Sequence, residues 1–563
     1  MFLQNYGITL NLAAKIYQEY GPKLYSIIKE NPYKLADDIP GVGFKMADEI
    51  AEKVGIFTDS DYRIRAGLLY ILLQASANGH TYLPQKELFS QAAELLKVET
   101  TAMEKHLMDM QIDRKVVVKT VPGSEPPEYL VYSSHYYYLE LNTARMLHDL
   151  NIRGDIPETE IRANLAKVQK KEEIHLDELQ EKAVFEAVNS GLLVITGGPG
   201  TGKTTTINAI IQYFENEGME ILLAAPTGRA AKRMTETTGY EARTIHRMLE
   251  LVPSGIPDSG SMSGNNALPV KWLFQFRWHA FDRNEENPLD ADVIIIDEMS
   301  MVDISLMHSL LRAVNVGTRL ILVGDVDQLP SVGAGNVLRD MINSERIPVV
   351  RLTRIFRQAQ GSRIIMNAHR INKGEAIDMR GGKNSDFFFA EKQTNEETVA
   401  TLVQYCKENL PRYYHVDPIQ DIQVLTPMQR GECGAANLNQ ILQEAMNPTD
   451  ICLRRGGTQY RLNDKVMQIR NDYDKEVFNG DIGTICKVDT EERELTVDFD
   501  GRKVVYDVTE LDELSLAYAV TIHKAQGSEY PIVVMPLYHE SLCDAATKSS
   551  LYRCYKGRRR YWY

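Results

Sequence analysis

The run Gly197-Gly198-Pro199-Gly200-Thr201-Gly202-Lys203-Thr204-Thr205 decides the fold of this chain. It fits the pattern G-x-x-x-x-G-K-[ST], in which glycines let backbone N–H groups converge on phosphate oxygens. The apolar residues 192–195 before it predict a buried strand, and residues 206–211 after it open a helix. A helix N-terminus that follows such a loop binds anions. The sequence therefore predicts a nucleoside triphosphate site, where Lys203 adds positive charge and the Thr204 hydroxyl can ligate Mg²⁺.

Further apolar runs that end in polar residues predict a parallel sheet with helices, an α/β fold. Residues 293–296 (VIII) end in Asp297 and Glu298. We expect Asp297 to hold the water shell of Mg²⁺, and Glu298 to orient and deprotonate the attacking water. Residues 320–323 lead toward Gln328, whose amide is expected to sense the γ-phosphate. The expected cofactors are ATP and Mg²⁺.

The bulk properties are those of an ordinary globular protein. The chain has 563 residues, of which 44% are hydrophobic and 25% charged, and its length suggests about four domains. Apolar runs too short to span a bilayer, scattered cysteines without a C-x-x-C pair and the lack of a signal segment favour a cytoplasmic protein with no membrane partner. The net charge of −14 neither proves nor excludes DNA binding, because a local basic lining is enough to hold a strand.

Six ordered motifs resemble those of the RecD-like DNA helicases of superfamily 1B, over about residues 175–540. The part before them is similar to the long RecD subfamily, which carries helix-hairpin-helix units ahead of its motor. The resemblance implies two RecA-like P-loop motor domains that hydrolyse ATP, translocate on single-stranded DNA and unwind forked duplexes, with 5′→3′ polarity and a role in repair or recombination. The motifs are GGPGTGKTT (197–205), APTGRAA (225–231), DEMS (297–300), GDVDQLPSVG (324–333), TPMQRGECGAANLN (426–439) and LAYAVTIHKAQGSEY (516–530).

The resemblance also implies roles for single residues. Gln180 is similar to an adenine-reading glutamine, Arg357 to an arginine that reaches the γ-phosphate from the second motor domain, and Glu529 to a carboxylate near the ribose. The implied catalytic residues are Lys203, Glu298, Gln328 and Arg357, and the nucleotide-binding residues are Gln180, Gly198, Pro199, Gly200, Thr201, Gly202, Lys203, Thr204, Thr205 and Glu529.

A second implied set would hold phosphates of the DNA strand without reading its sequence. For these residues, ordinary roles in caps and turns remain open alternatives. They are Thr227, Thr244, His246, Thr426, His523 and Lys524 in the motor, and Gly41 and Gly43 in a glycine turn before it.

The expected domain order follows from these motifs and from changes in composition. An all-helical helix-hairpin-helix region comes first, then a winged-helix-like module whose contact with DNA is left open, then a connector and two motor domains with small inserted β domains. The expected bounds are 1–57, 58–150, 151–175, 176–346 with a pin-type insertion at 248–289, 347–542 with an SH3-like insertion at 458–512, and a basic tail at 543–563.

The aromatic residues of the first insertion allow two interpretations. Packing within a strand face and stacking on a DNA strand are equally open. These residues are Trp272, Phe274, Phe276, Trp278 and Phe281.

The tail departs from the family pattern. The family continues into a helix resembling LLYTAVTRA, whose arginine also faces the γ-phosphate, whereas this chain ends CDAATKSSLYRCYKGRRRYWY. Codons can be chosen for Asp544 onward that, read one base later, give MQRQNLLYTAVTRAEEDIG. We therefore expect a frameshift from about Cys543. The alternative is a genuine nucleic-acid-binding tail of basic residues and tyrosines.

Two functional classes follow. The first is the DNA-dependent ATPase and helicase. The second is a nucleotide-binding, DNA-binding protein with little ATPase, because loss of an arginine finger costs about 10³–10⁵ in rate. The N-terminus is also expected to be cut, since Met1 falls just before the helix-hairpin-helix part.

Overall fold

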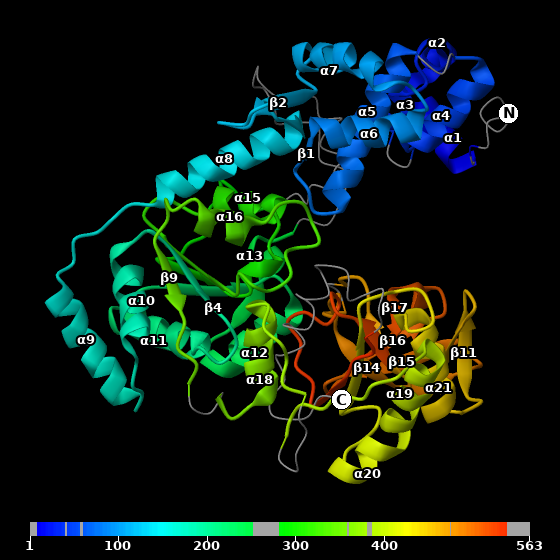
Figure 1. Ribbon diagram of the computed structural model, residues 1–563. Coiled ribbons are helices and arrows are strands. Elements are labelled where there is room, and N and C mark those ends of the chain that lie inside the picture. Colours follow the sequence, from blue (N-terminus) through cyan, green and yellow to red (C-terminus); the bar gives the residue numbers. More distant parts are fainter. Residues whose placement is uncertain are drawn as a thin grey trace.

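The computed structural model describes residues 8, 10–39, 42–56, 60–251, 281–356, 360–379, 385–472 and 475–537. Small helices form one end of the molecule, and a long helix, α8, leads from them to a large parallel sheet (Figure 1). A second group of strands and helices lies beside that sheet and contains the C-terminal described residues. Within the described residues, no helix is long and apolar enough to cross a membrane.

The N-terminal helices enclose a small apolar core. Ile16, Ile28 and Ile50 are fully buried in it. Gly43 precedes the last of these helices in extended backbone, at the predicted glycine turn, whereas Gly41 lies outside the described residues. The elements are α1 (Leu10–Tyr20), η2 (Gly21–Lys23), α2 (Leu24–Glu30), α3 (Lys34–Asp38) and α4 (Phe44–Val54).

The next segment combines four α-helices and a short 3-10 helix with a small antiparallel sheet of order β1-β3-β2. Two of the three strands of this sheet are Val116–Thr120 and Tyr129–Ser133. The winged-helix-like assignment of this segment stays a prediction. The elements are α5 (Asp61–Ala77), β1 (Tyr82–Pro84), α6 (Gln85–Leu96), η3 (Thr100–Ala102), α7 (Met103–Ile112), β2 (Val116–Thr120), β3 (Tyr129–Ser133) and α8 (Ser134–Leu150).

Helix α8 joins this module to the large sheet. Its side chains Leu139, Leu147 and Leu150 are buried in the same apolar cluster as Leu192 and Leu322 of the sheet. The Ser133 hydroxyl caps the start of the helix by accepting a hydrogen bond from Tyr136 N–H. Helix α8 is thus part of the core of the large sheet, whereas the helices before it have apolar clusters of their own.

The large sheet has six parallel strands in the order β6-β5-β7-β8-β4-β9. Alternate residues of β4 enter two different apolar clusters, Val194 on one face and Ile195 on the other. Burial on both faces explains the unbroken apolar runs that predict these strands, and it confirms the α/β class. The strands are β4 (Leu192–Gly197), β5 (Ile221–Ala225), β6 (Ala242–Thr244), β7 (Val293–Ile296), β8 (Arg319–Gly324) and β9 (Val349–Leu352).

Helices cover both faces of this sheet, and together with it they are called domain 1. The predicted connector at 151–175 contains a helix whose Ile161, Leu165 and Val168 are buried against α10 and α11, so this helix is a layer of domain 1. The helices are α9 (Glu158–Lys171), α10 (Glu178–Asn189), α11 (Lys203–Asn216), α12 (Gly228–Thr238), α13 (Ile245–Met248), η4 (Met299–Met301), α15 (Ile304–Arg312) and α16 (Val337–Asn343).

Domain 2 has a smaller parallel sheet of order β18-β10-β19. Its C-terminal strands pair with β10 from both sides, so the chain returns to this sheet after a long excursion. The elements are α18 (Arg363–Asn372), α19 (Asn395–Gln404), the π-helical η5 (Tyr405–Asn409), α20 (Leu410–Tyr414), β10 (Ile422–Thr426), α21 (Ala435–Met446), β18 (Ala519–Thr521) and β19 (Ile532–Val534).

The excursion forms an antiparallel sheet of order β16-β15-β14-β13-β17, here called the inserted sheet. Its strands β13 to β16 lie between residues 458 and 512, the bounds expected for the SH3-like insertion. A two-stranded ribbon precedes them. The strands are β11 (Cys452–Arg455), β12 (Thr458–Arg461), β13 (Lys465–Gln468), β14 (Ile482–Asp489), β15 (Glu494–Phe499), β16 (Arg502–Asp507), then η6 (Glu510–Glu513) and β17 (Leu514–Leu516).

Candidate nucleotide and DNA site

Five strands of domain 1 deliver polar residues to one edge of the sheet. Because the strands are parallel and in register, with Thr196 opposite Gly324 and Gly197 opposite Leu352, their carboxyl ends meet at this edge. The predicted phosphate loop follows β4, Asp297 follows β7 and Asp325 follows β8. Strands β5 and β6 bring the predicted DNA residues Thr227 and Thr244 to the other half of the same edge.

Gly202 lies at the tightest point of the phosphate loop. Its φ of +81° is left-handed, and a Cβ there would lie 2.5 Å from Gln180 Nε2 and 2.8 Å from Phe356 Cε2. Glycine is therefore required both by conformation and by space. The Gln180 amide donates to the Gly202 carbonyl at 3.2 Å, and its oxygen accepts from Asp177 N–H as part of a capping box. Gln180, which is 1% exposed, thus ties the start of α10 to the loop.

The loop holds its own shape through short hydrogen bonds. The Lys203 ammonium donates to the carbonyls of Gly197 and Gly198, at 2.5 and 3.1 Å. The Thr201 hydroxyl donates to the Gly198 carbonyl at 2.8 Å. Thr204 and Thr205 occupy the first turn of α11, next to Lys203. The lysine therefore lies over the loop that precedes its own helix.

Glu298 is held in a strained and buried position. Its backbone φ is +57°, a conformation that costs of order 1–3 kcal/mol for a residue with a side chain, and the residue is 4% exposed. Its N–H donates to Asp297 Oδ1 at 2.8 Å, so the two acids turn the chain together. Strain of this kind is typical of functional sites.

The Gln328 side chain lies between Asp325 and Ser300. Its amide lies 3.5 Å from Asp325 Oδ2, and its oxygen lies 3.5 Å from the Ser300 hydroxyl. The next residue, Leu329, is buried in an apolar cluster with Val520 and Ile522 of domain 2. Gln328, the predicted sensor of the γ-phosphate, is thus followed in sequence by a residue whose side chain packs against domain 2.

The segment after β9 crosses the phosphate loop. Phe356 N–H donates to the Gly200 carbonyl at 3.2 Å, and His369 Nε2 of α18 lies 3.2 Å from the Pro199 carbonyl. The contact of His369 was missed by sequence reasoning, since a single histidine in a helix carries no motif. Arg357, the predicted arginine, lies outside the described residues.

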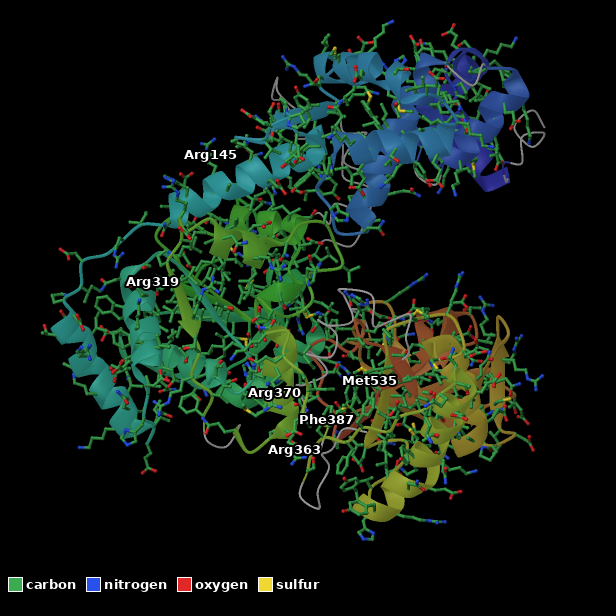
Figure 2. The ribbon with its side chains drawn as sticks, viewed as in Figure 1. Arg145, Arg319, Arg363, Arg370, Phe387 and Met535 are labelled. Carbon is green, nitrogen blue, oxygen red and sulfur yellow. The ribbon has the colours of Figure 1, made fainter. Side chains whose placement is uncertain are left out.

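The same segment leads to the junction with domain 2. Arg363 N–H at the start of α18 donates to Asp386 Oδ1 at 2.8 Å, and Figure 2 labels Arg363 and Arg370 of this helix together with Phe387 and Met535. The last two residues belong to the cluster that also holds Leu329. The phosphate loop and domain 2 are therefore linked through α18.

Two arginines of α12 reach domain 2. Arg229 donates to the Ser528 hydroxyl at 2.6 Å and to the Tyr530 hydroxyl at 3.2 Å. Arg233 lies 2.8 Å from a Glu529 oxygen and 3.8 Å from a Glu298 oxygen. Glu529, predicted near the ribose, is thus paired across the interface. Sequence reasoning did not single out Arg233.

The predicted DNA contacts of domain 1 lie at helix starts. Thr227 and Thr244 cap α12 and α13, accepting hydrogen bonds from Ala230 N–H and Arg247 N–H. His246 packs against Phe281, with ring centroids 5.9 Å apart. Thr244 is 9% exposed. Both threonines therefore make the caps that were the alternative interpretation.

The predicted DNA contacts of domain 2 are of two kinds. His523 and Lys524 are exposed after β18, beside the end of β10. Thr426, by contrast, is fully buried, and its hydroxyl donates to the Cys433 carbonyl at 2.6 Å. In this conformation Thr426 shapes the turn after β10.

A cavity of about 310 Å³ lies between α12 and the inserted sheet. The Phe478 side chain packs over Gly228, within 3.2 Å of where a Cβ would be. Lys232 and Asp500 form an ion pair across the two elements, at 2.5 Å. The lining of the cavity carries charges of both signs and includes Arg229, Arg247, Arg502, Glu476 and Asp481.

The insertion predicted at 248–289 is described only at its base. Leu251 and Phe281 form an antiparallel bridge there, and Phe281 packs against the domain 1 core, which is the packing interpretation for this aromatic residue. Trp272, Phe274, Phe276 and Trp278 lie outside the described residues, as does the tail 543–563.

The residues predicted for Mg²⁺ are oxygen donors. A threonine hydroxyl and an aspartate carboxylate suit this hard cation, which is held by one or two protein oxygens with waters and phosphates. Across the described parts of the chain, no group of three or more His, Cys, Asp or Glu side chains could hold a metal alone. Thr204 and Asp297 therefore fit a Mg²⁺ that arrives with the nucleotide.

Profiles of known domains match the chain along most of its length. The HHH domain of the ATP-dependent RecD2 DNA helicase matches residues 1–82, and the SH3 domain of the ATP-dependent RecD-like DNA helicase matches residues 438–499. An AAA domain matches residues 180–334, and a UvrD-like helicase C-terminal domain matches residues 516–547.

Individual proteins match as well. The ATP-dependent RecD2 DNA helicase of Deinococcus radiodurans is 32% identical over 561 residues, which cover 98% of this chain and 72% of that protein. The RecBCD enzyme subunit RecD of Haemophilus influenzae is 28% identical, over 66% of this chain and 67% of that subunit. The crystal structure of a Bacteroides Pif1 helicase with ADP-AlF3 and single-stranded DNA covers 68% of this chain and 90% of that one, with 19% identity and a TM-score of 0.38.

Proposed function

Because this chain belongs to the RecD2 family of ATP-dependent DNA helicases, we propose that it couples ATP hydrolysis between its two domains to 5′→3′ movement on single-stranded DNA. It then unwinds forked duplexes in DNA repair or recombination. Helicase activity follows from the family. The 5′→3′ direction and the biological role rest on the motif resemblance.

One observation supports the chemistry of this proposal. The phosphate loop, Asp297, Glu298 and Gln328 come from neighbouring parallel strands and lie at one sheet edge. In the proposed cycle Lys203 neutralises phosphate charge, and Glu298 takes a proton from the water that attacks the γ-phosphorus. Mg²⁺, held by Thr204 and Asp297, would supply charge neutralisation on the phosphates. After hydrolysis, ADP and phosphate are released from the site.

The coupling to DNA is proposed through the other half of that edge. Thr227, Thr244 and His246 of domain 1, with His523 and Lys524 of domain 2, would face the strand from both domains. Thr426 would contribute by shaping the turn next to it. Hydrolysis at one half of the edge would then alter the grip at the other half.

Strand displacement on tailed duplexes tests this function. The full chain with ATP should unwind a duplex with a 5′ single-stranded tail, and Glu298→Gln should not. Preference for a 3′ tail would reverse the proposed direction. If the chain hydrolyses ATP but unwinds neither substrate, it is a translocase or a nucleotide-dependent switch and not a helicase.

A second candidate function is nucleotide-dependent DNA binding with little hydrolysis. It is favoured by the residues after Cys543, which hold no counterpart of LLYTAVTRA. A variant in which residues 544–563 are replaced by MQRQNLLYTAVTRAEEDIG separates the two. If the second candidate is correct, both proteins bind a fluorescent ATP analogue, but the variant hydrolyses ATP faster by about 10³–10⁵-fold when single-stranded DNA is present. Equal rates would remove the second candidate.

A further inference from the structure

The Arg233 guanidinium lies between two carboxylates that belong to different domains. Its Nη2 is 2.8 Å from Glu529 Oε1 of domain 2, and its Nη1 is 3.8 Å from Glu298 Oε1 of domain 1. The Glu298 side chain is 5% exposed, whereas those of Glu529 and Arg233 are 24% and 32% exposed. One side chain thus contacts both the proposed base and the opposite domain.

We propose that Arg233 is a positioning residue that makes the orientation of the Glu298 carboxylate depend on the position of domain 2. This inference rests on the proposed function, because it assigns to Glu298 the role of base. It adds a specific route by which a DNA strand bound across both domains changes the rate of hydrolysis.

The physical basis is a shared cation. A guanidinium beside a buried carboxylate stabilises its ionised form and fixes its direction. The strength of that interaction falls with distance, and the guanidinium of Arg233 is closer to Glu529 than to Glu298. A shift of Glu529 relative to α12 therefore moves the guanidinium toward or away from Glu298. The orientation of the Glu298 carboxylate therefore responds to the position of domain 2.

A second arginine of the same helix keeps the partner loop in reach. Arg229 is one turn before Arg233, so both side chains lie on one face of α12. Arg229 binds Ser528 and Tyr530, the residues on either side of Glu529. The loop that carries Glu529 is therefore attached to α12 at three successive residues, and its position is passed to Arg233 directly.

Single-turnover hydrolysis by the full chain, at saturating ATP and with an oligodeoxythymidine strand, tests this role. Arg233→Ala should lower the rate about tenfold, while the affinity for a fluorescent ATP analogue changes less than about twofold. Arg233→Lys should recover part of the rate, because a lysine can reach only one of the two carboxylates at a time. Glu529→Gln should lower the rate similarly, and the double variant should be no slower than either single one.

Lys232→Ala provides the matched control. Lys232 is the adjacent residue on α12 and also pairs with another part of the chain across the interface, through the exposed Asp500. Exposed pairs contribute little, so this variant should keep the wild-type rate within about twofold. If Lys232→Ala loses as much of the hydrolysis rate as Arg233→Ala, any ion pair between α12 and domain 2 has the same effect. That result would overturn the specific role of Arg233.

The remaining outcomes separate the inference from the proposed function. If the rate losses of Arg233→Ala and Glu529→Gln multiply in the double variant, the inference is overturned. A loss of ATP affinity without a loss of rate would also overturn it. Both outcomes leave the helicase function intact. If the wild-type chain binds the analogue without hydrolysing it, the proposed turnover fails. The inference is then tested by the effect of the oligonucleotide on analogue affinity. In the Arg233→Ala and Glu529→Gln variants, the oligonucleotide should no longer change the affinity for the analogue. The inference is overturned if the oligonucleotide has no effect on the wild-type affinity, or if the variants keep that effect.

Discussion

At the scale of single residues, Gly202 is the position that tolerates a side chain least. Its positive φ and its contacts with Gln180 and Phe356 both exclude a side chain. Gly239 offers a matched control, since it ends α12 with a φ of +78° and has no atom within 4 Å of an added Cβ. Gly202→Ala and Gly239→Ala should each lose about 1–2 kcal/mol of stability from backbone strain. Only Gly202→Ala should also lose ATP binding, measured by titration with a fluorescent analogue. Equal nucleotide affinity in both variants would contradict this.

Glu298 is expected to act in the chemical step alone. Glu298→Gln keeps the shape of the side chain but removes the base, so the single-turnover rate should fall about 10²–10⁴-fold. Nucleotide affinity should stay within a few-fold, because the phosphate loop is unchanged. Rapid-quench measurement of ADP formation gives the rate, and a loss of less than tenfold would assign the proton transfer to another group.

Sequence patterns identified the residues with motifs and missed those without. Lys203, Asp297 and Glu298 follow apolar strands, and strand ends are visible in sequence. Arg233 and His369 are single charged or polar residues of helices, and only the tertiary fold brings them to Glu298 and Pro199. Thr426 shows the opposite case, since a motif residue is used here for an internal hydrogen bond.

At the scale of elements, β13 carries a buried ammonium. The pKa of Lys465 is lowered to about 7, mainly by burial and also by the nearby Arg229, against the opposing effect of Asp421 and Asp417. Its Nζ donates to the Ile422 carbonyl at 3.2 Å. The unfolded chain keeps this proton to about pH 10, so between about pH 7 and 10 the unfolded state binds more protons and stability rises with pH.

Lys465→Met tests this dependence. The free energy of unfolding of the wild type, minus that of the variant, should increase between about pH 7 and pH 9 and be flat below about pH 6. Urea denaturation at several pH values measures both. A difference that falls with pH would show that the ammonium is stabilised by its neighbours rather than destabilised by burial.

The predictability of the elements depended on how they are buried. Strands β4, β7 and β8 are buried on both faces, so their apolar runs predict them and their order along the chain. Helix α9 is charged over most of its surface, and only Ile161, Leu165 and Val168 form its apolar stripe. Such a narrow stripe does not indicate which partner it will cover. This is why a layer of domain 1 was predicted as a connector.

At the scale of the whole molecule, α8 joins the N-terminal module to domain 1. Leu147 of this helix is 7% exposed in the domain 1 core, whereas Leu141 is 50% exposed on the same helix. Leu147→Ala should cost about 2–5 kcal/mol, and Leu141→Ala less than about 0.5 kcal/mol. Scanning calorimetry should show the Leu147 variant lowering the transition of both parts together. Lowering of one transition alone would mean that the parts unfold independently.

The packing of α8 in the domain 1 core also affects how force passes through the protein. Close-packed cores resist shear, so we expect a load on α8 to pass to the sheet that carries the phosphate loop. Domain 2 is held to that sheet by a smaller apolar cluster and by the contacts of Arg229 and Arg233. In the proposed cycle, movement between the domains would therefore take place at that interface, while α8 and the phosphate loop would keep their relative positions.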